Sequence, residues 1–180
     1  MRLVFLLYFA MTTYASAQGL GGFVNGWLDR CYAHSNYLFS VARDGPSEVE
    51  KQERSRANLS RYRCASGILT VCEFSDDEVG CLRSATTWLN KRRVAVLQKM
   101  PADLRGGSRL QVRYRTFLNS GGTDMAGLLP DCGEAKGHDR LTRGGPAPFT
   151  AKQCDAYVAG HRLNRTLYWQ RLAEKVRSRR

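Results

Sequence analysis

The sequence predicts an all-α protein: a small, disulfide-stapled helical bundle of about four to five helices with a long Gly-rich loop. The first observation behind this prediction is periodicity, because apolar residues recur at helical spacings of three, four and seven while strand alternation is rare. The second is that all six cysteines follow a short export signal, and an even number of cysteines in an exported chain is typical of a disulfide framework.

The chain begins with the features of a secretory signal peptide. Met1-Arg2 gives a positive start, Leu3 to Met11 form an apolar run, and Ala15-Ser16-Ala17 supplies a small-residue cleavage site. We expect residues 1–17 to be removed and residues 18–180 to form a single domain that is periplasmic or secreted. The run of nine residues is too short for a hydrocarbon core of ~30 Å and no later segment is longer, so an integral membrane protein is not expected.

Two helices are predicted in the first part of this domain. The first runs from Phe23 to about Arg43, and its apolar face is expected to hold Phe23, Trp27, Cys31 and Leu38. Ser47 and Glu50 have the spacing of a capping box, which predicts a second helix over residues 48–64. That helix is highly charged, and its narrow buried stripe is expected to consist of Val49, Ala57, Tyr62 and Ala65.

Two further helices are predicted in the middle of the chain. A third helix is capped by Asp76 or Asp77 and ended by Pro101, and it should bury Leu82, Trp88 and Leu89, with Val79, Thr86, Val96 and Met100 on the same stripe. A weaker fourth helix over residues 104–118 should direct its apolar side chains inward: Leu110, Tyr114, Phe117 and Leu118.

A loop and a last helix complete the prediction. Residues 119–150 contain seven Gly and three Pro in 32 positions, which disfavours a helix and gives the long Gly-rich loop. The last helix runs from about Thr150 to Arg177, and its expected inner face consists of Cys154, Tyr157, His161, Leu167, Tyr168 and Leu172.

The order of the cysteines predicts how they pair, although all 15 pairings are formally open. A hairpin of the first two helices would join Cys31 to Cys64, and a short acidic loop would join Cys72 to Cys81. The Gly-rich loop would be tied to the last helix by a bond between Cys132 and Cys154. No C-x-x-C occurs and the spacings match no zinc pattern, so no metal site is predicted.

Several motifs resemble those of a known family. They are Cys64-Ala-Ser-Gly-Ile-Leu-Thr-Val-Cys72, Gly80-Cys81-Leu82, Trp88-Leu89-Asn90, the helix from Gln111 to Phe117, and Cys154 followed by Arg162, Arg165 and Leu167. Their order over residues 60–172 resembles the LprI-type lysozyme-inhibitor family of small exported bacterial domains. The resemblance implies a helical domain with a disulfide-bearing core that acts by binding, and lysozyme as one partner.

The charge of the chain points to an anionic partner. The formal net charge is +12, and 22 of the 28 cations are Arg, which favours bidentate contact with phosphate or carboxylate groups. Arg105, Arg109 and Arg113 recur every four residues and should form one stripe of the fourth helix. Export disfavours nucleic acid as the ligand, so we expect an anionic envelope surface or polymer. A solvated basic face without a ligand is the alternative.

One acidic segment offers a second binding surface. Glu73, Asp76, Asp77 and Glu78 lie between Cys72 and Cys81, where a disulfide would present them as a rigid acidic loop. Most lysozymes are cationic, so this loop is the candidate for lysozyme inhibition. The same residues would also form an ordinary helix cap.

No enzyme is predicted, and no cofactor. The three histidines, His34, His138 and His161, lie far apart in the sequence, and no local motif pairs one with a nucleophile. A secreted ribonuclease with two histidines and a basic surface is the remaining enzymatic alternative. We therefore expect an exported, non-enzymatic binding protein of the LprI-like type.

Overall fold

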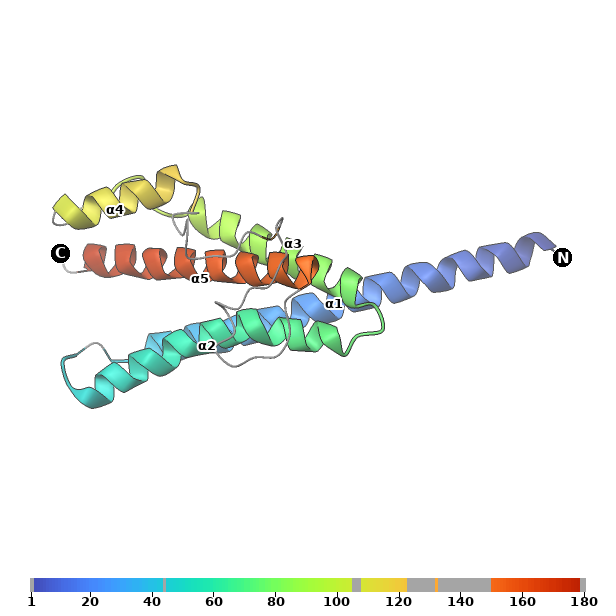
Figure 1. The fold of residues 1–180 in the computed structure, drawn as a ribbon, viewed down its shortest axis with the longest axis horizontal. Helices are drawn as coiled ribbons and strands as arrows, with labels where there is room; N and C mark the ends of the chain where they lie inside the picture. Colours follow the sequence, from blue (N-terminus) through green and yellow to red (C-terminus); the bar gives the residue numbers. More distant parts are fainter. Residues whose placement is uncertain (1, 44, 105–107, 123–131, 133–149, 179–180) are drawn as a thin grey trace. The chain divides into compact units, whose positions relative to one another are not determined.

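The computed structural model is all-α in the part of the chain that it describes (Figure 1). It describes residues 2–43, 45–104, 108–122, 132 and 150–178, with the backbone alone at 2–18, 108, 151 and 178. Five helices and no strand occur in these ranges: α1 Arg2–Val41, α2 Glu48–Glu73, α3 Glu78–Leu97, α4 Ser108–Asn119 and α5 Ala151–Ser178. The predicted fold class is confirmed. Most of the predicted Gly-rich loop lies outside the described residues, as do Arg105 and His138.

The chain divides into two compact units, residues 1–85 and residues 86–180. The first contains α1, α2 and the start of α3, and the second contains the rest of α3 with α4 and α5. The prediction of a single domain after a signal peptide stays a prediction. None of the described helices is long and apolar enough to cross a bilayer.

All three predicted disulfides are present, and no cysteine is free. They join Cys31 to Cys64, Cys72 to Cys81, and Cys132 to Cys154, with Cα–Cα distances of 5.8, 5.4 and 5.6 Å. Such a set of bonds is typical of proteins from an oxidising compartment.

In the first unit, α1 and α2 lie side by side as a hairpin (Figure 1). The buried face of α1 holds Val24, Leu28, Tyr32, Ser35 and Phe39. This face is one residue later than predicted, and Phe23 is 54% exposed. The error has a simple cause: each predicted core position is followed by another apolar residue, as in Phe23-Val24 and Trp27-Leu28, so the periodicity fits two adjacent faces equally well.

The α2 helix begins at the predicted capping box. Ser47 Oγ accepts the Glu50 backbone N–H, and the Glu50 carboxylate accepts the Ser47 N–H at 3.1 Å. The helix continues to Glu73 rather than stopping at Cys64, because no proline interrupts it. Its buried residues are Ala57, Arg61, Cys64, Ala65, Ile68, Leu69 and Cys72. Val49 and Tyr62 are exposed, so the prediction that they are buried is wrong.

Arg61 is buried on the hairpin interface, whereas the predicted Tyr62 beside it is exposed. Its guanidinium lies 3.6 Å from the centre of the Phe39 ring, and Nη2 donates to Asn36 Oδ1 at 3.1 Å. Ser60, the residue before Arg61, donates from its Oγ to Ser35 Oγ at 2.7 Å. Burial raises the pKa of the neighbouring Tyr32, and the Arg61 charge opposes that rise. The hairpin interface is therefore partly polar.

The second unit has an aromatic cluster formed by α4 and α5. Tyr114, Phe117 and Trp169 are almost fully buried, and the centres of the Tyr114 and Phe117 rings each lie 5.7 Å from the centre of the Trp169 ring. Tyr114 and Phe117 were predicted to be buried, but on α5 the expected Tyr168 is 49% exposed and its neighbour Trp169 takes its place. Adjacent large apolar residues leave the helical phase ambiguous here, as they do on α1.

The remaining core predictions are met to different degrees. Leu82 and Leu89 on α3 are buried, whereas Trp88, Tyr157 and Leu172 are only partly buried and Val79 is exposed. The α5 helix begins at a capping box, in which Thr150 Oγ1 accepts the Gln153 N–H at 3.3 Å and Gln153 Oε1 accepts the Thr150 N–H at 3.0 Å. The α4 helix begins at Ser108, four residues after the predicted start.

Candidate binding surfaces

The predicted arginine stripe is exposed on α4. Arg109 and Arg113 are both exposed, and neither forms an ion pair within the described part of the chain. Val112 beside them is 62% exposed. The helix holds this orientation because Tyr114 and Phe117 anchor its other side in the aromatic cluster. We call Arg109, Val112 and Arg113 the α4 arginine face; the third predicted member, Arg105, lies outside the described residues.

Another arginine of α4 already has a partner. Arg115 Nη2 donates to Asp103 Oδ2 at 3.1 Å, and Gln111 Nε2 donates to both carboxylate oxygens of Asp103. These hydrogen bonds, that of Arg115 first, hold the pKa of Asp103 below its usual value. Arg115 is thereby neutralised, while the α4 arginine face keeps its charge available.

The acidic segment forms a closed loop at the junction of α2 and α3. Glu73, Asp76 and Asp77 are exposed and Glu78 is partly buried, within the ring closed by Cys72 and Cys81. We call residues 73–80 the disulfide knob. Its most exposed apolar side chain is Phe74, at 84%. Phe74 was missed in the sequence, although an aromatic residue between carboxylates in a loop closed by two cysteines was a signal that could have been recognised.

Asp77 has a structural role within the disulfide knob. Its Oδ1 accepts the Gly80 N–H at 2.9 Å and its carbonyl accepts the Cys81 N–H at 2.9 Å, so it caps α3 as one of the two predicted residues. No cap contact involves Glu73 or Asp76 in the described structure. Helix capping therefore accounts for Asp77, but it gives no role to the exposed carboxylates of Glu73 and Asp76.

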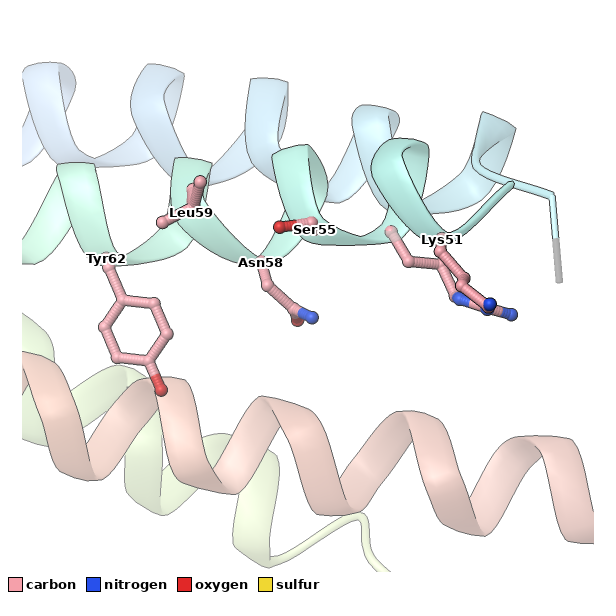
Figure 2. Close-up of a pocket in the computed structure, with 6 residues that line it drawn as sticks. Lys51, Ser55, Asn58, Leu59 and Tyr62 are labelled. Carbon is pink, nitrogen blue, oxygen red and sulfur yellow. The ribbon is translucent and has the colours of Figure 1, made fainter. Parts of the chain in front are cut away.

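An open hollow lies on α2 (Figure 2). It is lined by six residues of this helix: Lys51, Arg54, Ser55, Asn58, Leu59 and Tyr62. Figure 2 shows Lys51, Asn58 and Tyr62 extending from the same side of α2. The lining includes no histidine, cysteine or carboxylate, the groups that most often serve as nucleophile or general base.

The described histidines do not form a catalytic arrangement within either unit. His34 is exposed on α1 in the first unit, and His161 is partly buried on α5 in the second. The centres of the His161 and Tyr157 rings lie 4.2 Å apart. Burial lowers the pKa of His161. In the described part of the chain, no three His, Cys, Asp or Glu side chains gather where they could hold a metal ion.

Comparison of the chain with protein-family models, with curated proteins and with solved structures finds no match. The resemblance to the LprI-type family stays a prediction. Many of the residues on which it depends are buried: Cys64, Cys72, Cys81, Leu82, Leu89, Tyr114, Phe117 and Cys154. These residues are cystines and core side chains, so they bear on the fold, and the function must be argued from the exposed surfaces.

Proposed function

We propose that the protein is an exported, non-enzymatic binding protein of the LprI-like type, and that the α4 arginine face attaches it to anionic envelope material. The observation that carries this proposal is the presence of Arg109 and Arg113, exposed, one helical turn apart, and without an ion pair in the described structure. Exposed guanidinium groups bind phosphate and carboxylate groups in a bidentate manner at little desolvation cost.

Two further features support an anionic surface as the ligand. Val112 lies between the two arginines and is 62% exposed, so an apolar side chain accompanies the charges. Arg177 is exposed in the last turn of α5, so the second unit carries a further cation. Its charge acts on Tyr114 of α4, where it opposes the rise in the Tyr114 pKa that burial causes. Cations near a surface of anionic lipid contribute about 1 kcal/mol each, and the effect is screened by salt.

The test is co-sedimentation of the purified protein with vesicles of phosphatidylglycerol and phosphatidylcholine. Binding should require the anionic lipid and should weaken as salt is raised. The double variant Arg109→Gln/Arg113→Gln should bind at least several-fold more weakly. The matched control is Lys91→Gln/Arg92→Gln, which removes the same charge from exposed positions on α3. An equal loss in both double variants would show that net charge alone drives binding, and would contradict the role of the α4 arginine face.

A second candidate function is inhibition of lysozyme through the disulfide knob, and Phe74 is the observation that favours it. An aromatic side chain that is 84% exposed and held by a disulfide-closed loop is a suitable anchor for a protein partner. The exposed Glu73 and Asp76 would guide it to a cationic partner.

This candidate is tested by measuring lysozyme activity in the presence of the protein. Phe74→Ser and Glu73→Gln/Asp76→Asn should each relieve the inhibition, because one removes the anchor and the other the charges. Asp77 is left intact in both variants, since its loss would uncap α3. A wild-type protein that leaves lysozyme activity unchanged would exclude this candidate and leave the vesicle experiment unaffected.

A further inference from the structure

The open hollow on α2 brings cationic, polar and aromatic side chains together along one side of a helix (Figure 2). Lys51, Ser55, Asn58 and Tyr62 recur at spacings of four, three and four residues, so they share one stripe of α2. The stripe extends ~17 Å along the helix axis. The hollow has a volume of about 370 Å³, which is within the usual range of small-molecule sites. Its shape suits an elongated ligand.

Contacts within the first unit fix the orientation of the hollow. Cys64 is buried and bonded to Cys31 of α1, and the buried Arg61 contacts the Phe39 ring. Near the start of α2, Arg54 Nη2 donates to the Gly45 carbonyl at 2.9 Å. The hollow therefore lies on a helix that cannot rotate freely about its axis.

Two cations lie at the N-terminal end of the hollow. They are Lys51 and Arg54, and the described lining residues include no carboxylate. Lys51 pairs with Glu48, but both side chains are more than half exposed, so this pair is weak. An anionic group of a ligand can replace Glu48 at the ammonium group, and the guanidinium beside it supplies planar donors that match carboxylate oxygens.

The next carboxylates of α2 have partners outside the hollow. Glu50 accepts the Ser47 N–H in the capping box, and Glu53 pairs with Arg43 at 3.0 Å. These hydrogen bonds, to Ser47 and Arg43 respectively, lower the pKa of Glu50 and of Glu53. Both carboxylates are therefore engaged away from Lys51.

The rest of the hollow combines hydrogen-bonding groups with apolar surface. The Ser55 hydroxyl and the Asn58 amide can each donate and accept, as hydroxyl groups of a ligand require. Leu59 and Tyr62 are 50% and 47% exposed at the other end. The negative face of an aromatic ring attracts the C–H groups of a sugar ring.

We propose that the hollow on α2 binds an acidic saccharide, with a carboxylate at Lys51 and Arg54 and the sugar rings against Asn58 and Tyr62. A lipid headgroup shares the anionic contact, but its acyl chains would lie against the polar Ser55 and Asn58. The hollow is on the first unit and the α4 arginine face is on the second, so the proposal does not depend on the proposed function.

The experiment titrates the purified, isotope-labelled protein with oligogalacturonate and follows the amide signals by nuclear magnetic resonance. The signals of residues 51–62 and of the Asn58 side-chain amide should shift and saturate, and raised salt should weaken the binding. A neutral galactose oligosaccharide of the same length lacks the carboxylates, so it should bind at least several-fold more weakly.

Two variants test the assigned contacts. Lys51→Gln/Arg54→Gln should weaken binding of oligogalacturonate several-fold, because it removes both cations. Asn58→Asp keeps the size of the side chain but places a negative charge beside the ligand, so it should also weaken binding. The matched control is Arg56→Gln/Arg63→Gln, which removes the same charge as the first variant from exposed positions of α2 outside the hollow. Circular dichroism verifies that each variant is folded.

Three outcomes would overturn the proposal. An equal loss in the two double variants would show that net charge alone attracts the saccharide. Equal binding of the acidic and neutral oligosaccharides would remove the role of the carboxylate. Signals of α2 that respond to phosphatidylglycerol vesicles but not to oligogalacturonate would assign the hollow to a lipid headgroup. None of these outcomes changes the co-sedimentation test of the α4 arginine face, so the two proposals fail separately.

Discussion

The α1–α2 hairpin and the aromatic cluster of the second unit are held together by different interactions. The hairpin buries polar side chains, Ser35 and Arg61, beside apolar ones such as Leu28 and Phe39, and it is closed by the Cys31–Cys64 disulfide. The cluster buries the large rings of Tyr114, Phe117 and Trp169 instead. The difference predicts that the charged helix α2 depends on the Cys31–Cys64 disulfide to compensate for its narrow apolar stripe.

The strongest test of this comparison is Trp169→Ala in the cluster. Trp169 is 1% exposed and contacts both other rings, so truncation should cost ~3–5 kcal/mol of unfolding free energy. Tyr168→Ala, at the exposed neighbouring position, is the matched control and should cost much less. The unfolding free energy of both variants is measured by chemical denaturation. The signal is far-ultraviolet circular dichroism, which reports helix content and does not need Trp169. If the two costs were equal, the assigned face of α5 would be wrong.

The corresponding test of the hairpin removes its disulfide. Cys31→Ser/Cys64→Ser opens a loop with a sequence separation of 33, for which the chain-entropy model gives ~3–4 kcal/mol. Denaturation of the variant should show this loss without any reducing agent, whereas reductant should destabilise the wild type by more, because it opens all three disulfides. The comparison would fail if the hairpin kept its full stability, because α2 would then pack on its apolar stripe alone.

A third test concerns the polar part of the hairpin interface. Arg61→Ala removes the cation over the Phe39 ring and the hydrogen bond to Asn36, and should cost ~1–3 kcal/mol. Arg61→Met keeps most of the packing of the long side chain and should cost less. Denaturation curves of both variants give the two values. An equal loss in the two variants would show that the interface needs the charge and the hydrogen bond of Arg61, rather than the packing of its side chain.

These two regions also show which features the sequence predicts and which it does not. The disulfide pairing follows from the order of the cysteines along the chain, because each cysteine pairs with the next one. Ser47 and Glu50 predict a helix start, because a capping box needs only residues three positions apart. The buried face of α1 is predicted one residue out of phase, since Trp27-Leu28 offers two apolar choices. On α5 the prediction of Cys154 and Leu167 is confirmed, but Tyr168 is predicted where its neighbour Trp169 is buried. Only the packing partner decides between adjacent faces.

The candidate sites divide in the same way. The spacing of Arg109 and Arg113 predicts a shared helical face, which the structure describes as exposed. The effect of the Arg162 charge on the pKa of Arg93 is not visible in the sequence, because it depends on how the fold places α5 relative to α3. The exposure of Phe74 likewise depends on how the disulfide closes the loop.

The smallest expected effect is a pH dependence of stability that belongs to the second unit alone. Burial lowers the pKa of His161 on α5 below its ordinary value of 6.5, so between the two values the unfolded chain binds more protons than the folded one. Stability should therefore fall as the pH is lowered through about 6.5. Carboxylates with lowered pKa values, such as Glu53 and Asp103, lose their contribution only at more acidic pH, so the window from pH 7.5 to 5 reports mainly on histidine.

His161→Gln should flatten the Tm profile in this window, whereas His34→Gln, at an exposed position on α1, should leave its slope unchanged. A slope that persists in the His161 variant would place the titrating group elsewhere in the chain, and would remove this difference between the aromatic unit and the hairpin.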